Sequence, residues 1–287
     1  MGLSEPQTDS HAPQPRPGLS LGLVRLAGLA VVLLVLLGIL AYLVWPDGAY
    51  RRLTHDHDEL MVSRTAKPAS TVTVLFVGNS LTFVNDLPAM LVNVASSDPG
   101  ATVRLQVKAV TYPNASLDEM FEKGKALDWA REHHPDYVVL QEHSFWYDGD
   151  DEAARSVAFR WTNALKPLGA APLLFEVWTD GAASDVWKGQ SNPAEDALRA
   201  IQSTDGLGRS LGVPVVAVGQ AFEAARQTPG APDLYGPDHH HPSVAGSYLG
   251  ALAFYRYFTG RSGAEATYRP RGLSDQDAAA LVRRNGG

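Results

Sequence analysis

Three short segments of the sequence carry side chains that could together transfer an acyl group. The first, Gly78-Asn79-Ser80-Leu81-Thr82, directly follows the apolar, β-branched run 71–77. A serine between a strand and a helix is exposed at the edge of a sheet, and the helix offers its amide hydrogens to a developing negative charge. Ser80 is therefore a candidate nucleophile, although Thr82 stands where the elbow G-x-S-x-G has its last glycine. The alternative is an ordinary turn or N-cap serine.

The second segment, Asp238-His239-His240-His241-Pro242-Ser243, precedes the last long helical pattern. An aspartate three residues before a histidine can hold one ring nitrogen, which leaves the other nitrogen free to take a proton from a serine. Asp238 and His241 are therefore the candidate orienting carboxylate and general base. The same residue types also bind metals, but consecutive side chains point in different directions, so we expect no metal site and no cofactor. A polar loop without a chemical role is the third alternative.

The third segment, Leu140-Gln141-Glu142-His143, ends another apolar run. An amide side chain at the end of a buried strand could donate hydrogen bonds to an oxyanion. By itself, this pattern is more typical of a polar residue whose hydrogen bonds are all made to other protein groups at the strand end.

An alternating pattern of strands and helices must position these three segments. The expected strands are 71–77, 103–110, 136–141, 172–177 and 214–218, and the expected helices are 87–95, 116–131, 152–165, 194–211 and 243–259. Short apolar strands separated by helices predict a five-stranded parallel sheet that helices cover on both faces. Ligands of such α/β folds bind at the carboxyl ends of the strands, which is where the three segments lie.

Composition excludes several functional classes. The chain has 287 residues, 24 basic and 31 acidic side chains, a net charge of −7 and no cysteine. The absence of cysteine excludes a disulfide framework, a cysteine nucleophile and thiolate metal sites. The acidic balance is the opposite of what nucleic-acid binding needs, so we expect no nucleic-acid partner. A hydrophobic fraction of 45% excludes disorder of the whole chain.

The apolar residues are concentrated near the N-terminus. The run that begins at Leu26 and ends at Trp45 contains no charge and no proline, and it is long enough to cross a bilayer as a helix. No A-x-A cleavage site follows it, so we favour an uncleaved single-pass anchor over a signal peptide. The expected organisation is a disordered tail over 1–25, a transmembrane helix over 26–45, a linker over 46–70 and one α/β domain over 71–287.

Together, the three segments resemble the GDSL-like SGNH hydrolase superfamily, and in particular its bacterial members that have Gly-Asn-Ser in place of Gly-Asp-Ser. The resemblance runs from about residue 71 to residue 260 and includes the later pattern Gly246-x-Tyr248-Leu249-x-Ala251. It implies a flavodoxin-like three-layer α/β/α fold and serine-dependent ester hydrolysis. It also implies that Ser80 is the nucleophile, His241 the general base and Asp238 the carboxylate that orients it.

The oxyanion hole departs from the family pattern. The family uses the amide of the nucleophile, a glycine amide in a second block and an asparagine side chain in a third. Here the second block reads Tyr112-Pro113-Asn114-Ala115-Ser116-Leu117, with Asn114 in place of the glycine. Asparagine tolerates left-handed backbone better than most residues. We therefore expect the Ser80 and Asn114 amides and the Gln141 side chain to form the hole, with His143 as a weaker candidate.

The expected substrate is a short acyl ester. Trp146, Tyr147, Trp178 and Trp187 lie in or near strand-end loops, where aromatic faces could stack on sugar rings. No long apolar lid suggests a lipid channel, so we expect an acetyl group on a carbohydrate or a cell-envelope glycan. We expect Asn79, His143 and Trp178 to contact it.

Several alternatives remain open from the sequence. They are a lysophospholipase or thioesterase, an acyltransferase, a catalytically weak module that binds an acylated glycan, and a metal-dependent phosphoesterase. The sequence does not indicate the oligomeric state. The count of positive charges on the two sides of the apolar run slightly favours a cytoplasmic location for the domain that follows it. The margin is small, and we expect a membrane protein whose catalytic domain is extracytoplasmic.

Overall fold

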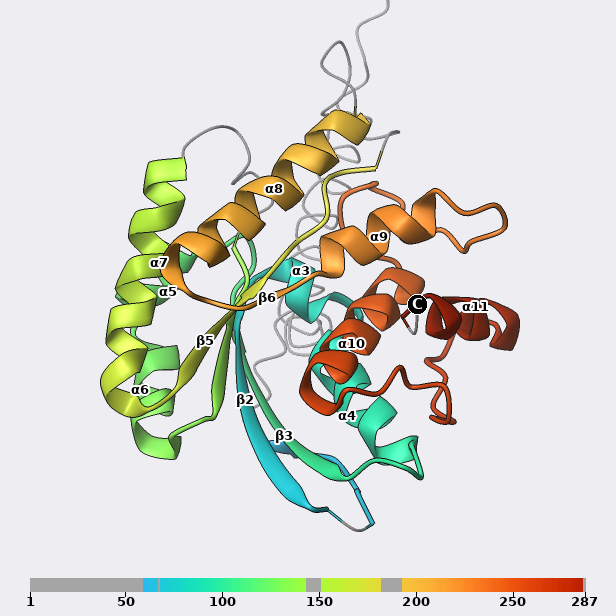
Figure 1. Ribbon diagram of the computed structural model, residues 1–287, viewed down its shortest axis with the longest axis horizontal. Helices are drawn as coiled ribbons and strands as arrows, with labels where there is room; N and C mark the ends of the chain where they lie inside the picture. Colours follow the sequence, from blue (N-terminus) through green and yellow to red (C-terminus); the bar gives the residue numbers. More distant parts are fainter. Residues whose placement is uncertain (1–58, 67, 143–150, 182–192, 286–287) are drawn as a thin grey trace, which may run out of the picture. The chain divides into compact units, whose positions relative to one another are not determined.

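The computed structural model describes residues 59–66, 68–142, 151–181 and 193–285, and Figure 1 shows how their helices and strands are arranged. The predicted tail, the predicted membrane span and the linker up to residue 58 lie outside these ranges. Within them, no helix is both long and apolar enough to cross a membrane. The span that begins at Leu26 stays a prediction.

A sheet of six strands forms the middle layer, in the order β1-β3-β2-β4-β5-β6. Its strands are β1 (Met61–Val62), β2 (Ser70–Gly78), β3 (Val103–Thr111), β4 (Tyr137–Leu140), β5 (Ala171–Phe175) and β6 (Val215–Val216). The five predicted strands are all present and pair in parallel. The prediction of a wholly parallel five-stranded sheet was wrong, because β1 adds an antiparallel edge strand beside β3.

The additional strand lies in the segment that we expected to be a linker. Met61 pairs with Val107, and Ser63 exchanges two hydrogen bonds with Leu105. The Ser63 amide donates to the Leu105 carbonyl at 2.8 Å, and the Ser63 hydroxyl accepts from the Leu105 amide at 2.9 Å. A strand of two residues has no alternation to detect in a sequence, which is why this pairing was missed.

The helices cover both faces of the sheet. They are α3 (Ser80–Phe83), α4 (Leu87–Ser97), α5 (Leu117–Lys123), α6 (Lys125–His133), α7 (Asp151–Leu165), α8 (Pro193–Leu211), α9 (Val218–Arg226), α10 (Val244–Thr259) and α11 (Asp275–Asn285), with short 3-10 turns at Val84–Asp86 and Lys166–Leu168. The single helix expected over 116–131 is two helices, because Gly124 takes a φ of 72° between α5 and α6. The sequence patterns did not predict α3, α9 or α11.

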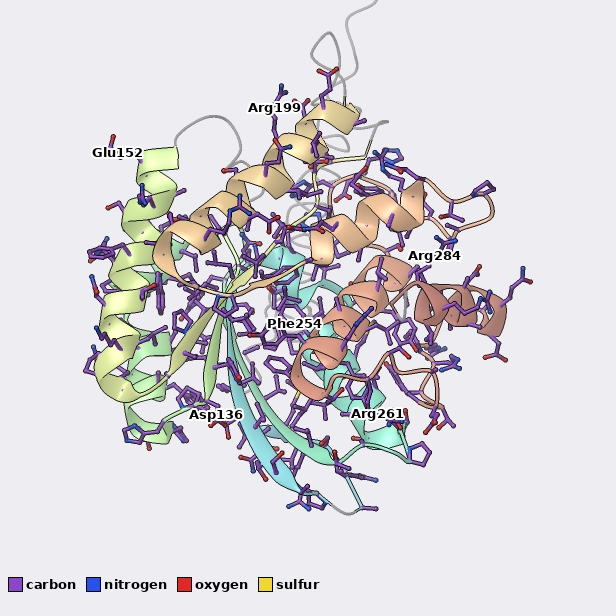
Figure 2. The ribbon with its side chains drawn as sticks, in the orientation of Figure 1. Asp136, Glu152, Arg199, Phe254, Arg261 and Arg284 are labelled. Atoms are coloured by element: carbon purple, nitrogen blue, oxygen red, sulfur yellow. The ribbon has the colours of Figure 1, made fainter. Side chains whose placement is uncertain are left out.

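The core is divided into two clusters by the sheet, which confirms the three-layer α/β/α arrangement. On β2, Val74 and Phe76 point into the cluster that includes α4, α9, α10 and α11. Leu75 and Val77 point into the cluster that includes α5, α6, α7 and α8. Phe254 of α10 packs edge-on against Phe76, with ring centroids 4.9 Å apart, and Figure 2 labels it between α10 and the sheet.

The topology fixes where a ligand can bind. β2 lies between β3 and β4, and the chain leaves β3 on one side to continue in β4 on the other. The carboxyl ends of β2 and β4 therefore flank the switch point, which is the usual ligand crevice of open α/β sheets. Ser80 directly follows β2 and Gln141 directly follows β4.

Candidate active site

A buried asparagine shapes the turn that carries Ser80. The Asn79 side chain accepts a hydrogen bond from the Leu81 amide at 3.1 Å and so caps α3. Its Nδ2 donates to the Ala115 carbonyl at 3.0 Å, which ties the turn to the loop after β3. Asn79 is only 2% exposed. The expectation that Asn79 contacts substrate was wrong, because both ends of its amide are used to position the turn.

Gln141 supports the same turn from the neighbouring strand. Its Oε1 accepts from the Asn79 amide at 2.8 Å and from the Thr82 hydroxyl at 2.9 Å, and its Nε2 donates to the Glu142 carbonyl. A backbone amide can only donate, so the Asn79 contact identifies the oxygen of this side chain. Gln141 is fully buried. This corrects the expectation that it donates to the oxyanion, because it is a positioning residue beneath the nucleophile.

The contacts of Gln141 also explain two neighbouring residue types. A Cβ atom on Gly78 would lie 2.5 Å from Gln141 Oε1, so this position accepts only glycine without rearrangement. Thr82, which replaces the last glycine of the nucleophile elbow, uses its hydroxyl to bind Gln141. The turn therefore reaches the same exposed serine through a different set of contacts.

His241, the predicted general base, lies on a closed loop between α9 and α10. The Gly236 amide donates to the His241 carbonyl at 2.7 Å, and the Ser243 amide donates to the Leu234 carbonyl at 2.9 Å. Asp238 Oδ1 accepts from the His241 amide at 3.0 Å and also from the His240 amide. The carboxylate thus caps its own turn with one oxygen and has the other available for a ring nitrogen.

The three predicted catalytic residues meet in space. His241 Nε2 lies 2.8 Å from Ser80 Oγ, and His241 Nδ1 lies 2.6 Å from Asp238 Oδ2. Burial raises the pKa of Asp238, but hydrogen bonds from the His241 ring and from two backbone amides outweigh it and bring the pKa to about 2. The carboxylate is therefore ionised at neutral pH and fixes Nδ1 of His241 as the donor. Such a chain of contacts can activate a serine hydroxyl.

Asn85 joins the segment of Ser80 to the loop of His241, and no pattern in the sequence predicts this. Its Nδ2 donates to the Pro242 carbonyl at 2.9 Å and to the Ser247 hydroxyl at 3.1 Å. Ser247 in turn donates to the Val84 carbonyl. The backbone of Asn85 is left-handed, with a φ of 58°. An asparagine before a proline-started helix signals a turn in a sequence, but nothing there shows that its amide reaches the loop of the general base.

Comparisons with known proteins add to this geometry. No family model matches the chain, and no curated protein matches it. Among solved structures, a candidate SGNH hydrolase from Slackia heliotrinireducens is 27% identical and has a TM-score of 0.56, with 66% of this chain and 99% of that chain covered. The chain is similar to the SGNH hydrolase superfamily in sequence and in fold, and this likeness supports a carboxylic ester hydrolase.

Two further structures share the fold. A DUF4886 family protein from Bacteroides uniformis has a TM-score of 0.63 at 16% identity, over 75% of this chain and 93% of its own. The lipase/acylhydrolase from Enterococcus faecalis has a TM-score of 0.51 at 13% identity, over 70% of this chain and 100% of its own. At these identities the likeness concerns the fold alone.

Of the three donors expected for an oxyanion hole, the Ser80 and Asn114 amides remain candidates, since the Gln141 side chain is buried and bound. Asn114 takes a φ of 55°, which confirms the left-handed backbone expected for the residue that replaces glycine. The neighbouring Ala115 carbonyl is bound to Asn79, so the Asn114 loop is held against the nucleophile turn. Within the described ranges, the Ser80 amide has no protein acceptor. The roles of these two amides stay predictions.

The expectation that Trp178 contacts substrate is corrected by its burial. Trp178 is 2% exposed and stacks on Phe222, with centroids 4.1 Å apart. Its Nε1 donates to the His240 carbonyl at 3.1 Å, so it supports the histidine loop and offers no face to a sugar. His143 lies outside the described residues, as do Trp146, Tyr147 and Trp187.

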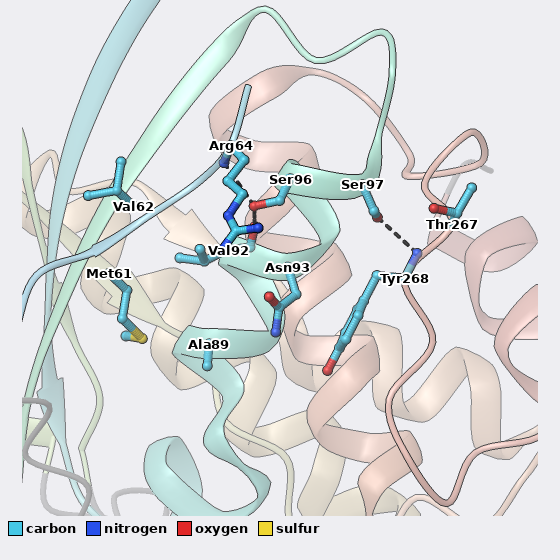
Figure 3. Close-up of a pocket in the computed structure, with 10 residues that line it drawn as sticks. All are labelled: Met61, Val62, Arg64, Ala89, Val92, Asn93, Ser96, Ser97, Thr267 and Tyr268. Carbon is cyan, nitrogen blue, oxygen red and sulfur yellow. Dashed lines mark hydrogen bonds between the residues drawn. The ribbon is translucent and has the colours of Figure 1, made fainter. Parts of the chain in front are cut away.

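A pocket of about 650 Å³ lies elsewhere, between β1, α4 and the segment before α11, and Figure 3 shows its lining residues. Its serines are already occupied, because Ser96 accepts from the Arg64 amide and Ser97 from the Tyr268 amide. It contains no residue of the triad. Among the residues that the structure describes, no cluster of histidine and carboxylate side chains is arranged to hold a metal ion.

Proposed function

We propose that this protein is a serine esterase that removes short acyl groups, in the first place acetyl, from a carbohydrate or a cell-envelope glycan. One observation carries the proposal: Ser80, His241 and Asp238 form a continuous chain of hydrogen bonds, with contacts of 2.8 and 2.6 Å. Their order and geometry suit a nucleophile, a base and an orienting carboxylate.

The first half-reaction transfers the acyl group to the enzyme. His241 Nε2 takes the proton of Ser80 as Oγ attacks the ester carbonyl, and the carbonyl oxygen becomes negatively charged. The amides of Ser80 and Asn114 donate to this oxyanion. Collapse of the tetrahedral intermediate breaks the bond to the alcohol, which takes the proton from His241 and leaves. The products are the free alcohol and an acyl ester on Ser80.

The second half-reaction returns the enzyme to its starting state. His241 Nε2 removes a proton from water, and the resulting hydroxide attacks the acyl ester. The second intermediate releases the carboxylic acid as Ser80 Oγ recovers its proton from His241. Asp238 stays ionised throughout, because its pKa is about 2, and it stabilises the imidazolium in both halves.

Features of the sequence indicate the acyl group and its carrier. The sequence contains no long apolar lid segment, which favours a short acyl group over a lipid chain. Stacking on a sugar ring now depends on Trp146, Tyr147 and Trp187, since Trp178 is buried. We further propose that the run 26–45 anchors the enzyme in a membrane with the domain on the extracytoplasmic side. A glycan of the cell envelope would lie within its reach there.

Hydrolysis of a short aryl ester tests the proposal. We expect purified protein to hydrolyse 4-nitrophenyl acetate and Ser80→Ala to lose this activity, because the nucleophile is gone. A panel of acetylated sugars, lysophospholipids and acyl thioesters then identifies the carrier. Equal turnover by pure wild-type and Ser80→Ala protein would refute the assignment. Activity on lysolipids alone would favour the lysophospholipase alternative.

A further inference from the structure

A second histidine–aspartate pair lies against the triad. His240 Nδ1 is 2.6 Å from Asp180 Oδ1, and Asp180 comes from the connection after β5. The His240 ring contacts the ring of His241 edge to face, with centroids 4.8 Å apart. The proposed reaction uses His241 and Asp238 but assigns no role to this pair.

Holding the loop in place does not require the second pair. Three other hydrogen bonds already join the two segments: Trp178 Nε1 to the His240 carbonyl, the Gly181 amide to the His239 carbonyl, and the Tyr235 hydroxyl to the Thr179 carbonyl. The Asp180 side chain is only 5% exposed. Burying a carboxylate beside an imidazole carries a desolvation cost that an apolar contact would avoid, so a purely structural role explains the pair poorly.

The contact with Asp180 determines what His240 can offer to a ligand. Asp180 accepts the proton of Nδ1, which leaves Nε2 as the other polar atom of the ring. In the described part of the chain, no residue provides a hydrogen-bond partner for Nε2. The hydrogen bond to Asp180 raises the pKa of His240, against the effect of burial. In the protonated ring, Nε2 becomes a charged donor, and 27% of the side chain is accessible.

We propose that His240, oriented by Asp180, forms a subsite that binds a carboxylate group of the substrate next to the scissile ester. The inference rests on the proposed esterase function and names the class of substrate, an acyl ester on an acidic glycan or on a dicarboxylic acyl group. The site offers one N–H donor, which matches a single carboxylate oxygen. Phosphate groups are usually bound by several donors at once.

The position of His240 makes this contact possible. The scissile carbonyl must lie beside Ser80 Oγ, which is 2.8 Å from His241 Nε2. The His240 ring is in van der Waals contact with that same imidazole. A carboxylate a few bonds away from the ester would therefore lie near the His240 ring while the carbonyl faces the nucleophile.

Two matched pairs of esters test the proposal. On the acyl side, mono-4-nitrophenyl succinate is compared with its methyl ester. On the alcohol side, 5-acetoxy-2-nitrobenzoate is compared with its methyl ester. The measured quantity is the ratio of kcat/KM for the anionic ester to kcat/KM for the neutral one. A general loss of activity cancels in this ratio, so a poorly folded variant does not imitate the effect.

Two variants separate charge from contact. His240→Asn keeps a donor to Asp180 but removes Nε2, and His240→Gln offers an uncharged donor in the direction of Nε2. We expect the ratio to fall about tenfold or more in His240→Asn for at least one pair, as is typical of a lost hydrogen bond to a charged group. We expect a smaller fall in His240→Gln, which keeps a donor but not the charge. The affected pair identifies the side of the ester that carries the carboxylate. Unchanged ratios for both pairs in both variants would overturn the proposal.

The wild-type enzyme provides a test that needs no variant. The charged groups that face His240 among the described residues are Asp180, Asp238 and His241. Asp238 stays ionised, and any change in activity that is common to both esters of a pair cancels in the ratio. We expect the anionic-to-neutral ratio to fall as the pH rises from about 6 to about 9, because His240 loses its charge. A flat ratio contradicts the subsite, whereas failure to hydrolyse either neutral ester refutes the esterase function instead.

Discussion

At the scale of single residues, Asp238 performs two tasks with one carboxylate. Oδ2 holds the His241 ring, and Oδ1 accepts two backbone amides of the same loop. Because its pKa is lowered to about 2, its stabilising effect is present above the unfolded value of 3.8 and is lost as the pH falls through about 2. The Asp238 carboxylate therefore stays ionised at every pH near neutrality.

An asparagine at this position separates the two tasks. We expect Asp238→Asn to fold, since its amide oxygen can still accept the backbone amides, but to lower kcat on 4-nitrophenyl acetate about a hundredfold or more. A neutral amide neither fixes the tautomer of His241 nor stabilises its imidazolium. Circular dichroism is the control for folding, and a kcat within a few-fold of wild type would contradict the role of Asp238.

The sequence predicted the three side chains that meet in space better than the residues that support them. Ser80 and His241 have few chemical alternatives, and a sheet edge is the common place for such groups. Gln141 was expected to form the oxyanion hole, and Asn79 and Trp178 to contact substrate, yet all three are buried and position other residues. A residue type and its place at a strand end do not show whether a side chain turns outwards or back into the fold.

At the scale of elements, Asn85 connects the nucleophile segment to the loop of the general base. We expect Asn85→Gly, which tolerates the φ of 58°, to lower kcat about tenfold with little change in KM, because a misplaced catalytic group costs rate. Asn85→Ala should lose about 1 kcal/mol of stability in addition, since alanine disfavours left-handed backbone. Steady-state kinetics and thermal unfolding measure both effects.

An exposed asparagine on α7 provides the matched control for this experiment. Asn163→Ala removes the same amide from a helix surface, and we expect kcat and the melting temperature to stay near wild type. If Asn85→Gly behaves like Asn163→Ala, the bonds from Asn85 to Pro242 and Ser247 do not position the triad.

A buried carboxylate that directly follows β5 and accepts hydrogen bonds from α9 predicts how stability depends on pH. Burial raises the pKa of Glu176 to about 7, although Gln220 donates two hydrogen bonds to it. Between the unfolded pKa and about 7, the folded protein holds a proton that the unfolded chain releases, so the free energy of unfolding falls as the pH rises. We expect the melting temperature of Glu176→Gln to rise relative to that of wild type as the pH increases from about 5 to about 8.

The control for Glu176 is an exposed glutamate on α6. Glu132→Gln should keep a constant difference in melting temperature from wild type over the same pH range. A Glu176→Gln difference that is equally constant would show that Glu176 is ionised in the folded protein at pH 5.

The elements themselves were largely predictable. Long apolar runs and the capping box at Ser116 gave correct strands and helix starts. The helix after Ser116 was taken as continuous because Gly124 is tolerated within a helical pattern, and only tertiary packing decides that it takes a left-handed φ. β1 has two residues, and its partners lie more than forty positions away in the sequence, so no local pattern predicts it.

At the scale of the whole molecule, the enzyme and its anchor are predicted to be separable. The second compact unit of the chain begins at Arg51 and contains both core clusters of the sheet. We expect a variant that begins at Arg51 to fold and hydrolyse 4-nitrophenyl acetate, and to stay in the supernatant after cell lysis and ultracentrifugation. The full chain should sediment with membranes, because the run 26–45 is long enough to span them.

The control is a full-length variant with two charged residues in the middle of that run, which should release the protein from the membrane fraction. Equal distribution of all three proteins between supernatant and membranes would refute the anchor. Protection of the full chain from external protease in intact spheroplasts would refute the extracytoplasmic orientation.

Covalent labelling of Ser80 tests the proposed reaction most directly. A fluorophosphonate reacts with a serine only when a neighbouring base activates it. We predict one adduct per chain, located at Ser80 by mass spectrometry of the digested protein, and no adduct after Ser80→Ala or after heat denaturation. The label should also form much more slowly in His241→Ala. An adduct at another residue, or no adduct on folded wild-type protein, would contradict a triad built from Ser80, His241 and Asp238.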